Sequence, residues 1–187
     1  MKISTIKVNR TFISYKIVFF NSFIIFTCVL SASGCFSTPK ANSSTSSANY
    51  LGAGDTFPVT SITTIQAEVV ELDNPNKKKL IILFATWCHD SNRLFKAFEK
   101  TNILSDPNIE VIAISKMESD AVVKAWRQKK NIKTPLALDK NGKIYHQFAS
   151  TGLPRIVTIG NNNKIISAQL ADHPNPKNQL AKIIWTL

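Results

Sequence analysis

Apolar residues recur in short runs along most of the chain, and their spacing predicts alternating strands and helices. A continuous apolar run at 80–84 is typical of a strand that is covered on both faces, and a second buried strand is predicted at 109–114. Helices are predicted where apolar residues return every three or four positions. The clearest are 93–100, 120–130 and a last helix that Asn175-Pro176 opens. The helix at 120–130 is expected to bury Val122, Val123 and Trp126.

Shorter apolar stretches predict the remaining strands. A strand pair is predicted at 62–65 and 68–72, and a brief strand at 136–138. A hairpin is predicted at 156–159 and 165–170, around a run of three asparagines. The order of elements is β-α-β-α-β followed by β-β-α, which indicates an α/β fold with one mixed sheet.

The first 34 residues predict an export signal that is removed from the folded protein. Basic residues precede a mostly apolar stretch at 17–30, which is short and interrupted for a membrane span. Residues 35–49 are rich in Ser, Thr and Asn and predict a flexible tether with a reach of roughly 20 Å. The folded domain is then 50–187, which is long enough for one hydrophobic core.

The small residues at 31–34, followed by Cys35, resemble the lipobox of bacterial lipoproteins, with Ala32 where that family usually has leucine. The resemblance implies cleavage before Cys35, a lipid anchor on it, and a location in the bacterial cell envelope facing the periplasm. Phe36 resembles the pattern of lipoproteins that are sent on to the outer membrane. Ordinary secretion and an uncleaved anchor are the alternatives.

The formal net charge of +11 includes four basic residues of the predicted signal. Two lysine runs, 77–79 and 129–130, are predicted to be solvated, with attraction to anionic envelope surfaces as the alternative. An exported chain excludes nucleic acid as a partner.

Cys88 is the residue with the clearest chemistry. It lies between a predicted buried strand and a predicted helix, where unpaired backbone N–H groups and the helix dipole favour thiolate over thiol. Cys28 would leave with the signal and Cys35 would carry lipid, so Cys88 is expected to be the one free thiol and a disulfide scaffold is excluded. Ser91 stands where a second cysteine would complete Cys-x-x-Cys.

The strand, Ala85-Thr86-Trp87-Cys88, the helix, and Gly152-Leu153-Pro154 before a later strand together resemble the thioredoxin fold. The closer resemblance is to its TlpA/ResA-like (redoxin) branch of envelope-tethered thiol-disulfide proteins. It implies a mixed central sheet flanked by helices, an N-terminal β-hairpin, and an inserted strand–helix unit between Cys88 and Pro154.

The resemblance also implies a site. Cys88 would be the nucleophile, Pro154 would be cis and face it, and a substrate peptide would pair with the backbone of Leu153 as an added strand. Three residues differ from the family's pattern. Ser91 replaces the resolving cysteine, Asp90 replaces the usual proline, and Ile82 stands where thioredoxins carry a buried acid. The expected substrate-binding residues are Trp87, His89, Asp90, Ser91, Leu153 and Pro154.

The leading functional hypothesis is monothiol exchange by Cys88 on exported or envelope proteins that carry thiols or disulfides. Release of the client would need an external thiol donor or a second client thiol. A protonated His89 would favour the thiolate and Asp90 would oppose it, and a solvated His89 is favoured over a general base. This chemistry needs no cofactor and no metal.

Three other functions remain open at this stage. One is a non-catalytic binding or chaperone module that uses the groove beside Pro154. A second is peroxide sensing through sulfenic acid at Cys88. The third is copper delivery by Cys88, His89 and His146 or His173, although their spacing forms no paired-ligand pattern.

Overall fold

The computed structural model describes residues 49–186, so the predicted signal, Cys35 and nearly all of the predicted tether lie outside the described residues. The described part contains seven strands, three α-helices and two short 3₁₀ helices, and none of its helices has the length and apolar content to cross a bilayer. In chain order they are β1 (Ser61–Thr63), β2 (Val69–Glu71), β3 (Lys78–Phe84), α1 (His89–Phe98), η1 (Ile103–Ser105), β4 (Ile109–Lys116), α2 (Asp120–Lys130), β5 (Leu136–Asp139), η2 (Tyr145–Gln147), β6 (Arg155–Ile159), β7 (Ile165–Leu170) and α3 (Pro176–Thr186).

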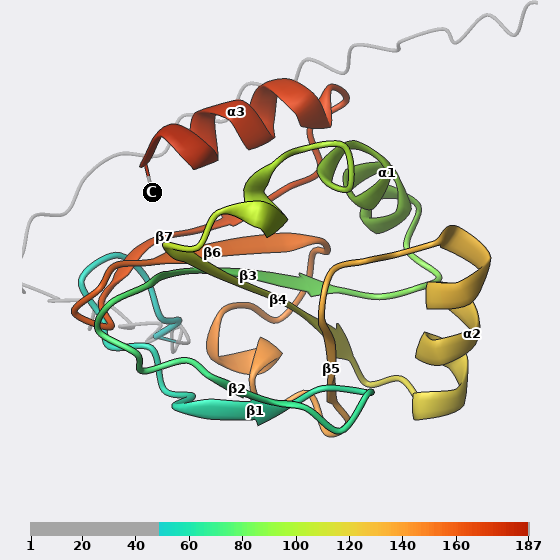
Figure 1. The fold of residues 1–187 in the computed structure, drawn as a ribbon, viewed down its shortest axis with the longest axis horizontal. Coiled ribbons are helices and arrows are strands. Elements are labelled where there is room, and N and C mark those ends of the chain that lie inside the picture. Colours follow the sequence, from blue (N-terminus) through green and yellow to red (C-terminus); the bar gives the residue numbers. More distant parts are fainter. Residues whose placement is uncertain (1–48, 187) are drawn as a thin grey trace, which may run out of the picture. The chain divides into compact units, whose positions relative to one another are not determined.

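The main sheet has five strands in the order β5-β4-β3-β6-β7 (Figure 1). Strands β3, β4 and β5 are parallel, β6 runs antiparallel to β3, and β7 runs antiparallel to β6. Strands β1 and β2 form a separate antiparallel pair. The predicted mixed sheet and N-terminal hairpin are confirmed, and α2 with β5 supplies the strand–helix unit expected between Cys88 and Pro154.

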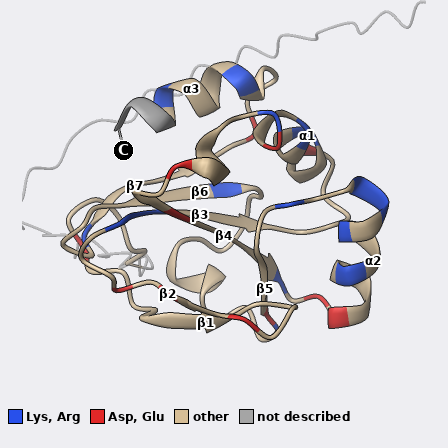
Figure 2. Ribbon diagram, viewed as in Figure 1, with Lys and Arg blue, Asp and Glu red and all other residues tan. Residues whose placement is uncertain are grey.

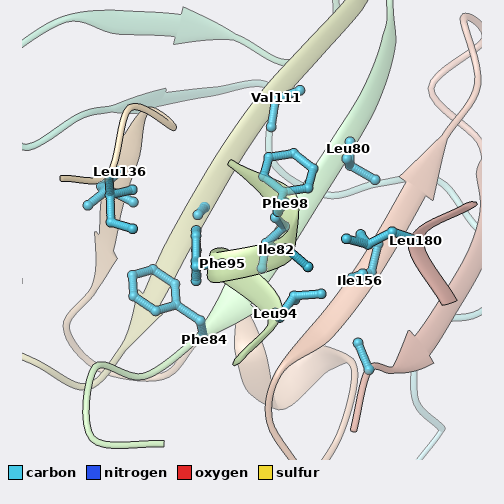
Figure 3. Close-up of a cluster of buried hydrophobic side chains, with 14 of the residues drawn as sticks. Leu80, Ile82, Phe84, Leu94, Phe95, Phe98, Val111, Leu136, Ile156 and Leu180 are labelled. Carbon is cyan, nitrogen blue, oxygen red and sulfur yellow. The ribbon is translucent and has the colours of Figure 1, made fainter. Parts of the chain in front are cut away.

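The central strand β3 is buried on both faces, and its side chains alternate between two cores. Leu80, Ile82 and Phe84 point to the face that the three α-helices cover (Figure 3). There Phe84, Phe95 of α1 and Trp126 of α2 pack as a ring cluster with centroids 5.0–5.1 Å apart. This cluster fixes α1 and α2 against the end of β3, which is where the chain turns into Cys88.

The opposite face of the sheet is covered by loops and short elements. Ile81 and Leu83 of β3 pack there against Phe57, Tyr145 and Phe148. The hairpin β1–β2 and the 3₁₀ helix η2 lie on this side, below the sheet in Figure 1. The segment that leads from η2 to β6 therefore runs from this core to the C-terminal end of β3.

Two burial predictions are wrong in detail. Val122 was expected in the core with Val123 and Trp126, but it is 48% exposed. It lies about 100° around the helix from Val123, and the stripe that faces the sheet is centred on Val123 and Trp126. Lys79, expected to be solvated, is fully buried because its strand position points inward and its Nζ donates to the Asn74 carbonyl at 2.8 Å.

Candidate functional site

Cys88 is the N-cap residue of α1, with extended backbone angles (φ −74°, ψ 123°). Strand β3 ends at Phe84, and the Cys88 N–H donates to the Ala85 carbonyl at 3.2 Å across the intervening turn. The first helical bond follows at once, from Asn92 N to the Cys88 carbonyl at 3.1 Å. The predicted placement of this cysteine between a buried strand and a helix start is confirmed, and its thiol is free and partly buried.

The loop before β6 lies against this thiol. The Leu153–Pro154 peptide bond is cis, as predicted. The Cys88 Sγ lies 3.5 Å from the Leu153 carbonyl oxygen, to which it donates. The backbone N–H of Leu153 has no hydrogen-bond partner within residues 49–186. Cys88 therefore lies against the carbonyl of the Leu153–Pro154 peptide, where the resemblance implied a contact.

Gly152 and Tyr145 support this loop from below. Gly152 has φ +91°, where a side chain is strained, and a Cβ there would lie 3.0 Å from Leu170 Cδ1. The buried Tyr145 hydroxyl donates to the Gly152 carbonyl at 2.9 Å. Burial raises the pKa of the Tyr145 phenol above its ordinary value, and the neighbouring Arg155 opposes that shift. The hydroxyl is therefore a permanent donor to the loop at neutral pH.

The neighbours of Cys88 separate into exposed and buried residues. Trp87 is 75% exposed, and the His89 side chain is 87% exposed. Asp90 Oδ1 pairs with the Arg93 guanidinium at 2.9 Å and lies 3.5 Å from His89 Nδ1. Trp87, His89 and Asp90 thus form an accessible rim around the thiol. His89 is solvated, as expected, and its ring makes no hydrogen bond to the Cys88 sulfur.

Ser91 does not belong to that rim. Its side chain is fully buried, and its Oγ accepts a hydrogen bond from Ala85 N at 3.4 Å. The geometry shows no hydrogen bond from Ser91 to the Cys88 sulfur, so its interpretation as a substrate-contacting residue is corrected. Ser91 instead ties the first turn of α1 to the end of β3.

Asn92 holds the Cys88 turn, and its role was missed from the sequence. Its Nδ2 donates to the carbonyls of Thr86 and Cys88, each at 2.8 Å. Its Oδ1 accepts from the Trp126 indole N–H at 2.9 Å. The Asn92 amide therefore uses all its hydrogen-bonding groups. It connects Thr86 and Cys88, the residues on either side of Trp87, to Trp126 of α2.

Glu118, in the loop between β4 and α2, was also missed. Its carboxylate accepts hydrogen bonds from the Thr86 N–H at 2.8 Å, from the Thr86 hydroxyl and from the Ser115 hydroxyl. Ser115 is fully buried near the end of β4. Glu118 therefore connects the Thr86–Cys88 turn to the neighbouring strand of the sheet.

Within the described residues, His146 and His173 form no metal-binding group with Cys88 and His89. The His146 ring packs edge-on to Tyr145 with centroids 5.5 Å apart, and His173 Nδ1 accepts from Asn175 N at 2.9 Å. Across residues 49–186, His, Cys, Asp and Glu side chains form no group of three or more that could hold a metal ion.

The chain resembles known proteins in both sequence and structure. The family model described as Redoxin matches residues 52–184. The thiol-disulfide oxidoreductase ResA of Bacillus thuringiensis subsp. konkukian is 26% identical over 113 aligned positions, and the match covers 56% of this chain and 62% of that protein. The chain thus matches less than two thirds of that relative's length.

Two solved structures are similar over most of their length. One is a proposed protein disulfide isomerase from Bacteroides thetaiotaomicron, with 23% identity and a TM-score of 0.63, over 72% of this chain and 91% of that one. The other is a proposed thiol:disulfide interchange protein DsbE from Chlorobium tepidum, with 19% identity and a TM-score of 0.64, over 73% and 98%. These likenesses establish the thioredoxin-like fold that the sequence predicted.

Proposed function

The chain belongs to the redoxin family, and from that premise we propose that it exchanges thiols and disulfides through Cys88. One observation carries the proposal. The free Cys88 thiol lies at the N-terminus of α1, and its sulfur is 3.5 Å from the Leu153 carbonyl oxygen. The backbone N–H of Leu153 is unpaired within the described part of the chain. A nucleophile and an open backbone edge therefore lie side by side.

The proposed reaction has two steps. The Cys88 thiolate attacks one sulfur of a client disulfide, the client S–S bond breaks as the new one forms, and the second client sulfur leaves as a thiolate that takes up a proton. The mixed disulfide is then resolved in one of two ways. If another client thiolate attacks the client sulfur, Cys88 leaves as a thiolate and the client disulfide is rearranged without net oxidation. If an external dithiol donor reacts, its first thiolate attacks the Cys88 sulfur and releases the reduced client, and its second thiolate then attacks the donor sulfur bound to Cys88, which frees Cys88 and leaves the donor as a disulfide.

The client segment is proposed to lie across the rim around Cys88. An extended peptide could pair with the free Leu153 N–H as an added strand, which recognises backbone rather than sequence. Trp87, which precedes Cys88 in the chain, offers an exposed apolar surface, and His89 and Asp90 offer polar contacts. The clients proposed are exported or envelope proteins that carry thiols or disulfides.

Trapping tests this function directly. Because no second cysteine stands at position 91, the native full-length protein is expected to accumulate client mixed disulfides, visible on non-reducing gels after acid quenching and alkylation. The variant Cys88→Ser should lose all of them, whereas Ser91→Ala should keep them. Retention of the same partners by Cys88→Ser would show binding without exchange and would overturn the proposal.

We also propose that the domain is tethered to the bacterial envelope by lipid on Cys35, facing the periplasm and on the outer membrane. The lipobox-like run before Cys35 supports this proposal. The full-length chain expressed in bacteria is expected to sediment with membranes, and Cys35→Ala should move it to the soluble fraction. Membrane association that is unchanged in Cys35→Ala would contradict the anchor.

A further inference from the structure

A pocket of about 290 Å³ lies between α1 and α2, on the helical side of the Cys88 turn. Its floor is apolar and is formed by the buried side chains of Phe95, Trp126 and Ile132. Its rim carries three lysines, Lys96, Lys100 and Lys130. The volume is at the lower end of the range of about 300–1,000 Å³ for small-molecule sites.

The rim is positively charged, and its lysines are not neutralised within the described structure. Lys96, Lys100 and Lys130 are exposed, and none of them has an ion pair among the described residues. Lys130 lies in the last turn of α2 together with Arg127 and Lys129, and Figure 2 shows that end of the helix in blue. Three cations therefore surround one apolar floor.

The acidic residue of the pocket, Glu99, is occupied by its own neighbours. Its Oε1 accepts from the Thr134 N–H at 3.1 Å and from the Thr134 hydroxyl at 2.6 Å, and its Oε2 accepts from Lys133 N at 3.0 Å. The carboxylate is thus directed to the loop after α2, where it accepts three hydrogen bonds. It offsets one of the three lysine charges at most.

From this combination we propose that the pocket binds a small organic anion, a carboxylate on an apolar body. The apolar floor favours burial of an aliphatic chain or a ring, and the three lysines favour a negative charge at the opening of the pocket. A sugar or another strongly polar molecule is a poorer match, because the floor is apolar and the amide of Asn92 at the pocket wall already uses its groups on Thr86, Cys88 and Trp126. This inference does not rest on the thiol chemistry.

Two sources could supply such a ligand, a free aliphatic acid and the C-terminal carboxylate of a peptide that ends in apolar residues. Octanoate is the probe for the first source. N-acetyl-leucyl-phenylalanine, compared with its C-terminal amide, is the probe for the second. Binding of one acid and not of the other identifies the source, and either result supports the site.

The test measures binding by calorimetry to the full chain, with octanoate, octanol and octylammonium as ligands of equal length and different charge. Octanoate is expected to bind roughly tenfold more tightly than octanol, and octylammonium more weakly than both. The triple variant Lys96→Gln/Lys100→Gln/Lys130→Gln should weaken octanoate binding by roughly tenfold, because three exposed ion pairs are lost.

The matched control is Lys129→Gln/Lys140→Gln/Lys143→Gln, which removes three exposed lysines that do not line the pocket. It should leave binding within about twofold, and Cys88→Ser should also bind normally. Equal binding of the three octyl ligands, equal losses in both triple variants, or no saturable binding of either acid would each overturn the proposal. Since Cys88→Ser is included, failure here is distinguishable from failure of thiol exchange.

Discussion

Changing Ser91 to cysteine is expected to shorten the lifetime of Cys88 mixed disulfides by roughly 100-fold or more, because resolution becomes intramolecular. Ser91 lies in the first turn of α1, three residues after Cys88, and its side chain points inward from the same helix start. The introduced thiol could attack the Cys88 sulfur, form a disulfide within the chain and release the client as a thiol. Loss of the Ser91 hydrogen bond to Ala85 should cost about 1 kcal/mol of stability.

The measurement is the decay of trapped mixed disulfides after removal of external thiols, followed on non-reducing gels. Ser105→Cys is the matched control, since it adds an exposed thiol just before β4, at the opposite end of the parallel strands from Cys88. Ser105→Cys should leave the decay unchanged. A lifetime that is equally long in Ser91→Cys would mean that the Cys88 sulfur is inaccessible from within the helix.

The elements that the sequence predicted best are those with local signals. Helix α2 begins and ends where predicted, because Ser119 caps its N-terminus and Asn131 closes it in the left-handed region. Strand β7 also matches its predicted bounds. Cys88 and Leu153 were located through a motif and its resemblance, and their meeting across 65 residues follows once the fold is given.

The supporting residues of the site could not be found in the same way. Asn92 and Glu118 act on partners 34 and 32 residues away, respectively, and each looks like an ordinary polar surface residue in its own segment. Tyr145 lies in the short 3₁₀ helix η2, in a segment without apolar periodicity, although it is fully enclosed by the core under β3. A buried Trp126 needs an acceptor for its indole N–H, and this need was the one available hint to Asn92.

Glu118 is expected to have the largest effect on stability among these supporting residues. Glu118→Ala removes the acceptor of three hydrogen bonds at once and leaves the Thr86 N–H and the buried Ser115 hydroxyl unpaired. Hydrogen bonds to a charged group contribute about 1.5–3 kcal/mol each, so a loss of roughly 3 kcal/mol or more in the free energy of unfolding is expected. Glu118→Gln keeps one acceptor oxygen and should lose about half as much.

Urea unfolding measures these losses, and the alkylation rate of Cys88 in native buffer reports the turn itself. Glu110→Ala is the matched control, because Glu110 makes one ion pair with Lys77 at the surface and should cost less than about 1 kcal/mol. If Glu118 anchors the Thr86–Cys88 turn to β4, Glu118→Ala changes both stability and alkylation, whereas Glu110→Ala changes neither by much. Loss of stability with an unaltered alkylation rate would confine Glu118 to a structural role at the end of β4, separate from the thiol.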